Sequence, residues 1–93
     1  MINKNIIRIR KKLDKLDNLF LNLIKRRTKL VDQVLQNKKF KNQIVDRKRI
    51  KVILKNISKK SKDKKIDPKI TNRIWLSMIK AFIDYEFRNF KKK

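Results

Sequence analysis

Residues 4–39 read KNIIRIRKKLDKLDNLFLNLIKRRTKLVDQVLQNKK, and neither proline nor glycine interrupts them. Apolar side chains recur here at alternating three- and four-residue spacings, as on one face of an α-helix. This apolar stripe consists of Ile6, Ile9, Leu13, Leu16, Phe20, Leu23, Leu30 and Val34. The pattern predicts one helix over residues 4–39, about 54 Å long. A domain of this size has a radius of gyration of only about 12–13 Å. Such a helix therefore needs a partner along its length, most simply a second copy of itself.

A second helix is predicted over residues 46–59, after a short polar connector at 40–45. Asp46 is suited to the N-cap position, because its carboxylate can accept a hydrogen bond from a backbone N–H of the first turn. The apolar face of this helix consists of Ile50, Ile53, Leu54 and Ile57.

A third helix is predicted over residues 67–90, after a solvated loop at 59–65. Asp67 supplies the cap, and Pro68 occupies the first helical position, where its missing N–H costs nothing. The apolar positions of this helix are Ile74, Trp75, Met78, Ile79, Phe82, Ile83 and Phe90. No strand pair is predicted. We therefore expect an all-α fold of three helices in a single domain spanning residues 1–93.

The composition excludes several kinds of chemistry. The 93 residues contain no cysteine, histidine or glycine, which excludes disulfides, thiolate or imidazole metal sites and glycine-based phosphate loops. We expect neither a metal nor a cofactor. No apolar run approaches the roughly 20 residues that span a bilayer, and the N-terminal residues lack the apolar block of a signal peptide. We expect a cytoplasmic protein without membrane association.

The net charge of +22 is of the kind that suggests a nucleic-acid or anionic membrane partner. The lysines are nevertheless scattered along the chain, with runs only at 59–65 and at the C-terminus. Scattered lysines suit solvated helix faces better than one focused groove. A basic nucleic-acid-binding protein is therefore retained as the more distant alternative.

Charged residues at apolar positions are more informative. Arg27 follows Phe20 and Leu23 on the stripe, and Lys38 follows Leu30 and Val34. If both lie on one helix, their separation of eleven residues, about three turns, points them the same way. Arg10 adjoins the stripe.

Glu86, the one glutamate of the chain, falls on the apolar face of the third helix. Buried charges need partners. Glu86 could pair with Arg27 or Lys38 as a structural salt bridge, or the long cationic side chains could extend to water. Together these groups would instead form a net-positive pocket that suits a small dicarboxylate, because arginine pairs bidentately with carboxylates and lysine adds a point donor. Such a pocket could position a substrate and stabilise a transition state electrostatically.

The order and spacing of these residues resemble the all-helical chorismate mutases over nearly the whole chain. The matching pattern is Ile9-Arg10-(x)2-Leu13-Asp14-(x)2-Asp17, Leu23-Ile24-(x)2-Arg27, Lys38, Asp46-(x)2-Arg49, Ile66-Asp67-Pro68 and Glu86. The resemblance implies an intertwined homodimer with two active sites, in which the long first helices pack across the two-fold axis. It implies the Claisen rearrangement of chorismate to prephenate, without cofactor, in phenylalanine and tyrosine synthesis.

The resemblance also implies a role for each residue. Arg10, from one subunit, and Arg27, from the other, would bind the two substrate carboxylates. Lys38 would contact a carboxylate and the ether oxygen. Arg49 would add positive potential, and the Asp46 region would contact the ring hydroxyl.

Glu86 would donate a hydrogen bond to the ether oxygen, which it can do only when protonated. Activity is then expected to fall with rising pH, and Glu86→Gln should be less pH-dependent.

Two positions depart from the best-known mutases. Ile50 stands where many carry a glutamate that binds the substrate hydroxyl, and Phe82 where many carry a small hydroxyl residue. Apolar residues at both places resemble the isochorismate-pyruvate lyases, which form salicylate and pyruvate on the same fold. This lyase activity is the first alternative function. A helical dimerisation module with buried ion pairs is another.

Overall fold

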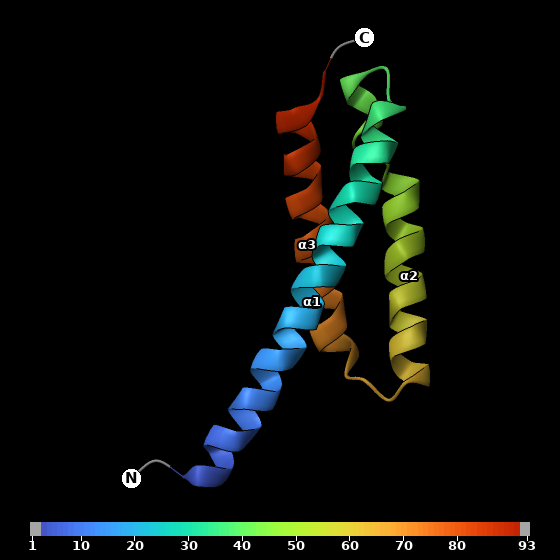
Figure 1. The fold of residues 1–93 in the computed structure, drawn as a ribbon. Coiled ribbons are helices and arrows are strands. Elements are labelled where there is room, and N and C mark those ends of the chain that lie inside the picture. The colour runs from blue at the N-terminus through green and yellow to red at the C-terminus, as the bar shows by residue number, and fades with distance from the viewer. Residues whose placement is uncertain (1–2, 92–93) are drawn as a thin grey trace. The chain divides into compact units, whose positions relative to one another are not determined.

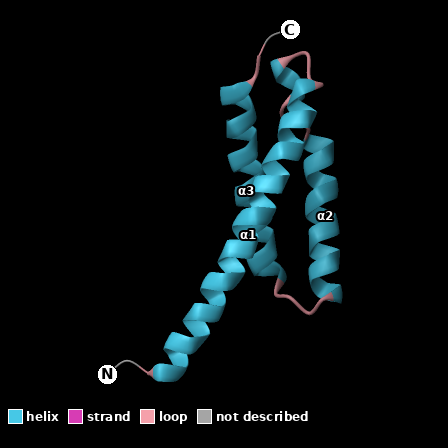
Figure 2. Cartoon of the chain, in the orientation of Figure 1, coloured by secondary structure: helices cyan, strands magenta, loops and turns pink. Residues whose placement is uncertain are grey.

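The computed structural model describes residues 3–91, and these are almost entirely helical. The elements in chain order are α1 (Lys4–Gln36), a short 3₁₀ helix η1 (Lys41–Gln43), α2 (Arg47–Asp63) and α3 (Pro68–Asn89). Figure 2 shows these helices and the short loops that join them. The described part of the chain contains no strand, which confirms the predicted all-α class. None of its helices combines the length and apolar composition that crossing a membrane would need.

The chain divides into two compact units, Met1–Val31 and Asp32–Lys93. From Lys4 onward, the first unit consists only of α1 residues. None of its described residues, 3–31, is buried. Its large apolar side chains remain exposed, at 52% for Leu13, 59% for Leu16 and 56% for Leu23. This unit therefore has no core of its own.

The second unit contains the buried core of the described chain. Its buried apolar residues are Leu35, Ile44 and Ile79. Helices α2 and α3 lie side by side and run in opposite directions (Figure 1). The predicted apolar face of α2 is half-buried at all four positions, as expected of a helix that packs on one side. Ile44, only 3% exposed, lies in the connector that the sequence predicted to be polar.

The starts of α2 and α3 agree with the sequence. The Asp46 carboxylate accepts a hydrogen bond from the backbone N–H of Arg49 at 3.0 Å. The Asp67 carboxylate accepts one from Lys69 at 2.9 Å, and Pro68 opens the helix. Both aspartates satisfy N–H groups that have no partner inside the helix.

The end of α1 comes at Gln36, three residues earlier than predicted. The backbone N–H groups of Asn37 and Lys38 donate to the carbonyls of Val34 and Leu35, both at 3.0 Å. These three-residue bonds tighten the last turn and close the helix. Lys38 consequently lies beyond the helix, so the premise that Arg27 and Lys38 lie on one helix was wrong.

The end of α2 comes at Asp63, four residues beyond the predicted end at residue 59, so the predicted loop was wrong over 60–63. Ser61, only 3% exposed, explains the extension. Its hydroxyl donates to the Ile57 carbonyl at 2.6 Å and lies 2.6 Å from the hydroxyl of Thr71 on α3. A buried contact with α3 thus stabilises the last turn of α2, although lysines surround it in the sequence.

Helix α2 ends in a Schellman motif without glycine. The Ile66 N–H donates to the Ser61 carbonyl at 2.8 Å, and the Lys65 N–H donates to Lys62 at 3.1 Å. The motif requires a left-handed residue directly after the C-cap, which is Lys64 here, and Lys65 takes that conformation with φ 58°. A lysine here carries a steric cost that glycine would avoid.

Candidate active site

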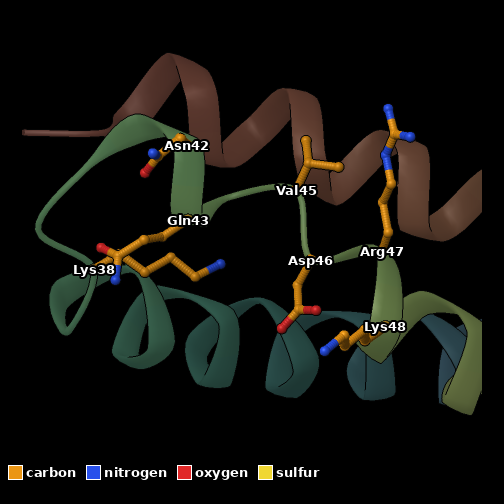
Figure 3. A pocket seen from close by; sticks show the side chains of 7 residues that line it. All are labelled: Lys38, Asn42, Gln43, Val45, Asp46, Arg47 and Lys48. Carbon is orange, nitrogen blue, oxygen red and sulfur yellow. The ribbon is translucent and has the colours of Figure 1, made fainter.

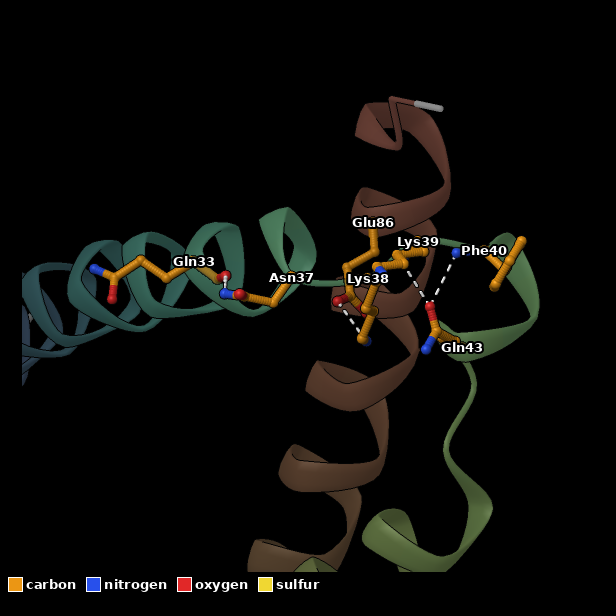
Figure 4. A network of polar contacts seen from close by, with 7 residues as sticks. All are labelled: Gln33, Asn37, Lys38, Lys39, Phe40, Gln43 and Glu86. Atoms are coloured by element: carbon orange, nitrogen blue, oxygen red, sulfur yellow. Dashed lines mark hydrogen bonds and ion pairs between the residues drawn. The ribbon is translucent and has the colours of Figure 1, made fainter. Parts of the chain in front are cut away.

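Lys38 and Glu86 meet in the second unit. The Lys38 Nζ lies 3.0 Å from the Glu86 Oε1, and their side chains are only 17% and 8% exposed (Figure 4). Lys38 lies in the turn after α1, whereas Glu86 lies in the last turn of α3. Since a buried charge is costly without a partner, each group makes the burial of the other tolerable.

Side chains of neighbouring residues hold the turn that carries Lys38. The Gln43 side-chain oxygen accepts hydrogen bonds from the backbone N–H groups of Lys39, at 2.7 Å, and Phe40, at 2.9 Å. The Asn37 side chain donates to the Gln33 carbonyl at 2.8 Å (Figure 4). The Asn37 bond reaches a carbonyl of the last turn of α1, and the Gln43 bonds satisfy two N–H groups of the turn itself. The backbone is therefore held on both sides of Lys38.

An open hollow of about 740 Å³ lies beside Lys38. It is lined by Lys38, Asn42, Gln43, Val45, Asp46, Arg47 and Lys48. Figure 3 shows Arg47 extending to the opposite side from Asp46 and Lys48. The lining includes three cations and one carboxylate, so its net charge favours an anionic ligand.

The remaining predicted residues of the second unit occupy different surroundings. Asp46 lines the hollow, and one of its carboxylate oxygens caps α2. The Arg49 side chain is exposed, and Ile50 is half-buried on the first turn of α2. Phe82 is half-buried on α3, and its ring meets Tyr85 edge-on at a centroid distance of 6.4 Å. The structure therefore brings Lys38 to both Glu86 and the Asp46 side of the hollow.

Arg10 and Arg27 belong to the first unit, Met1–Val31. Both lie on α1, where Arg10 is exposed and Arg27 is half-buried. Seventeen residues separate them, close to five helical turns. One substrate molecule could not span that length, so the two arginines of one α1 cannot serve the same small site.

A comparison with protein families matched residues 9–87 to the family described as chorismate mutase type II. The chain belongs to the chorismate mutase type II family. Enzymes of this family are isomerases that convert chorismate to prephenate, and the assignment supports the same function for this chain. The resemblance inferred from Arg10, Arg27, Lys38 and Glu86 is thereby confirmed at the level of the family. Neither the curated proteins nor the solved structures gave a match.

The sequence did not predict one polar contact of the second unit. The Tyr85 hydroxyl donates a hydrogen bond to the Asp32 Oδ1 at 2.7 Å, between α3 and the last turns of α1. This bond raises the pKa of Tyr85 above its usual range, with burial and the Asp32 charge acting in the same direction and Arg88 opposing them. No spacing rule connects residues 53 positions apart, so the sequence carried no signal for this pair.

Proposed function

We propose that two copies of the chain form a homodimeric chorismate mutase, with each active site built from both subunits. The observation that carries this proposal is the largely buried Lys38–Glu86 pair beside a hollow of net positive charge. Chorismate is a dicarboxylate, and such a surface attracts it electrostatically. The reaction needs no nucleophile, so a cation and a hydrogen-bonding group are chemically sufficient.

The rearrangement places negative charge on the ether oxygen as its C–O bond breaks. We assign Lys38 to that oxygen and to one carboxylate, because an ammonium group in a water-poor site opposes developing charge strongly. Glu86 is the second group at the ether oxygen, to which it donates a hydrogen bond once its carboxylate has taken up a proton from solvent. On substrate binding, the Lys38 ammonium would exchange its Glu86 contact for contacts to the substrate.

The other predicted residues bind and orient the substrate. Arg27 of one subunit and Arg10 of the other bind the carboxylates. This division between subunits is consistent with their separation of about five turns on one α1. Arg49 adds positive potential on the α2 side.

Asp46, which lines the hollow, faces the ring hydroxyl in this proposal. Ile50 and Phe82 form an apolar boundary on the same side of the substrate. Holding the substrate in its folded conformer supplies part of the rate acceleration, since the two reacting ends must meet.

The exposed apolar stripe of α1 supports the dimer. Leu13, Leu16, Phe20 and Leu23 are each between 47% and 59% exposed in the single chain. Helices in proteins owe most of their stability to packing of an apolar face, and the first unit has no core against which this face packs. A second α1 packed along the stripe would cover these side chains.

The proposal extends to the biological setting. We propose that residues 1–93 act as one domain in the cytoplasm and that the prephenate they form enters phenylalanine and tyrosine synthesis. Neither a metal nor a cofactor takes part in this chemistry. The described residues hold no cluster of three or more acidic groups suited to a metal ion.

The test is a two-substrate assay on the purified protein. Incubation with chorismate should consume it and yield prephenate, identified by NMR, without added metal or cofactor. Incubation with isochorismate should yield no salicylate. Salicylate from isochorismate together with no prephenate from chorismate would overturn the proposed reaction in favour of a lyase. Failure to consume either substrate would overturn it as well.

A further inference from the structure

Two polar contacts join the same pair of segments in the second unit. The Tyr85 hydroxyl donates to Asp32 at 2.7 Å, and one residue further along α3 Glu86 meets Lys38 at 3.0 Å. Asp32 lies in the last turns of α1, and Lys38 lies six residues later in the turn that follows. Any shift of the end of α1 along α3 would therefore disturb both contacts together.

The Asp32–Tyr85 contact is a strong and well-supported hydrogen bond. Its acceptor is a carboxylate, which makes a bond to a hydroxyl shorter and stronger than a neutral pair would. Both side chains are half-buried. The Phe82 ring meets the Tyr85 ring edge-on, with an angle of 82° between their planes, an orientation that aromatic pairs favour. The raised pKa of Tyr85 agrees with a phenol that keeps its proton for Asp32.

Lys38 has a particular need for such support. Its ammonium group sits at the end of a flexible four-carbon side chain, and its backbone lies outside the helix. Gln43 fixes the local turn, but that bond lies within the connector and does not reach α3. The position of the turn relative to α3 must come from contacts that cross between the two elements. Asp32–Tyr85 is such a contact, on the α1 side of the turn.

We propose that Asp32 and Tyr85 are a positioning pair, which holds the end of α1 on α3 so that the Lys38 ammonium and the Glu86 carboxyl face one reacting oxygen. The inference rests on the proposed function of Lys38 and Glu86. Neither member of the pair contacts the substrate. Their effect passes through the placement of Lys38, and misplacement of a catalytic group by about 1 Å can cost up to about a hundredfold in rate.

The test compares variants by kcat and KM below their unfolding temperatures. Tyr85→Phe keeps the ring contact with Phe82 and removes only the hydroxyl. We expect it to lower kcat roughly tenfold while KM changes less than about twofold, because transition-state placement is lost and ground-state binding is kept. Asp32→Ala should do the same. Asp32→Asn retains an oxygen acceptor and should keep kcat within about twofold of the wild type.

Ser61→Ala is the matched control. It also removes a side-chain hydrogen bond between two helices, here α2 and α3, and it lies outside the proposed site. It should lower the unfolding temperature and leave kcat unchanged. If Tyr85→Phe, like Ser61→Ala, lowers the unfolding temperature and leaves kcat unchanged, the pair contributes only to stability and the proposal is overturned.

A second readout separates this inference from the proposed function. In ¹⁵N NMR of the substrate-free protein, the Lys38 ammonium, assigned by its loss in Lys38→Gln, should give a slowly exchanging signal. Tyr85→Phe and Asp32→Ala should broaden or abolish it, whereas Ser61→Ala should not. An unchanged signal in Tyr85→Phe would overturn the positioning role. If the wild type does not turn over chorismate, the proposed function fails and this NMR comparison alone decides the inference.

Discussion

The two units of the chain carry similar apolar periodicity but differ in what covers it. In the unit Asp32–Lys93, Leu35, Ile44 and Ile79 are buried, and the apolar face of α2 is half-buried. In the unit Met1–Val31, none of the described residues is buried. Periodicity thus predicts a helix in both cases, but it does not reveal whether the partner of that helix is in the same chain.

The largest expected effect comes from a charge on the exposed stripe of α1. Leu16→Glu would place an unpaired carboxylate in the proposed dimer interface of both subunits, where an uncompensated buried charge costs about 3–5 kcal/mol. We expect the variant to be monomeric by light scattering and to lose nearly all turnover. Leu21, five residues on and about 140° around the helix, provides the matched control. Leu21→Glu should remain dimeric and active. A dimeric, active Leu16→Glu protein would refute the interface.

The next largest effect is a loss of turnover when Lys38 of the second unit is replaced. Lys38→Gln removes the ammonium but keeps a side chain that can hydrogen-bond to Glu86. We expect kcat/KM for chorismate to fall by about 10²–10³-fold, the usual cost of losing a donor to a developing oxyanion. Lys39→Gln makes the same charge change at an exposed neighbour and should retain wild-type activity. Equal losses in both variants would show that net charge, not the Lys38 contact, governs turnover.

A smaller effect on stability is expected at the end of α2. Lys65 has φ 58°, and a left-handed conformation costs a non-glycine residue about 1–2 kcal/mol. Lys65→Gly should therefore raise the free energy of unfolding by about 1 kcal/mol, reduced by the greater freedom of glycine in the unfolded chain. Urea denaturation of both proteins measures this difference. Lys64→Gly, one residue earlier with φ −90°, should instead destabilise. No gain for Lys65→Gly would indicate that Lys65 is unstrained.

The smallest effect is a pH dependence within the second unit. The bond to Asp32 raises the pKa of Tyr85, so the folded protein holds the phenolic proton more tightly than the unfolded chain does. This contribution to stability is fully present below the usual tyrosine pKa of about 10 and is lost as the pH rises through the higher pKa of the folded state.

The wild type should therefore be more stable than Tyr85→Phe at about pH 8, and the difference should shrink above about pH 10. Urea denaturation at several pH values measures it, and the lysines titrate in both proteins alike. A difference that stays constant across this range would contradict the assigned pKa shift.

The starts of the helices were more predictable than their ends. Asp46, Asp67 and Pro68 are local signals, and each acts where the sequence placed it. The turn that follows the end of α1 depends on the Gln43 side chain bonding back to residues 39 and 40. The end of α2 depends on Ser61 meeting Thr71 across the helix pair. Neither contact has a sequence signature.

The candidate site was predictable in part, and for a physical reason. A carboxylate on an apolar face needs a partner. This rule singled out Glu86 in the sequence and gave Lys38 as one of its two possible partners. In the structure the Lys38 Nζ lies 3.0 Å from the Glu86 Oε1. The Asp32–Tyr85 bond could not be predicted from the sequence. Asp and Tyr are common on solvated helix faces, and nothing in the sequence shows that these two meet once the helices pack. The family assignment came from the ordered spacing of many residues, which no single motif in the chain would have supplied.

Mixing two inactive variants tests the central claim most directly. Arg10→Ala and Lys38→Gln should each be inactive alone, since each removes a group from both sites of its dimer. If Arg10 acts in trans, a mixed dimer combines both defects in one site and leaves the other intact. Co-refolding equal amounts should then restore about one quarter of wild-type turnover, because half of the dimers are mixed and each has one working site. No restored turnover, in samples that mass spectrometry shows to contain mixed dimers, would contradict a site shared between two chains.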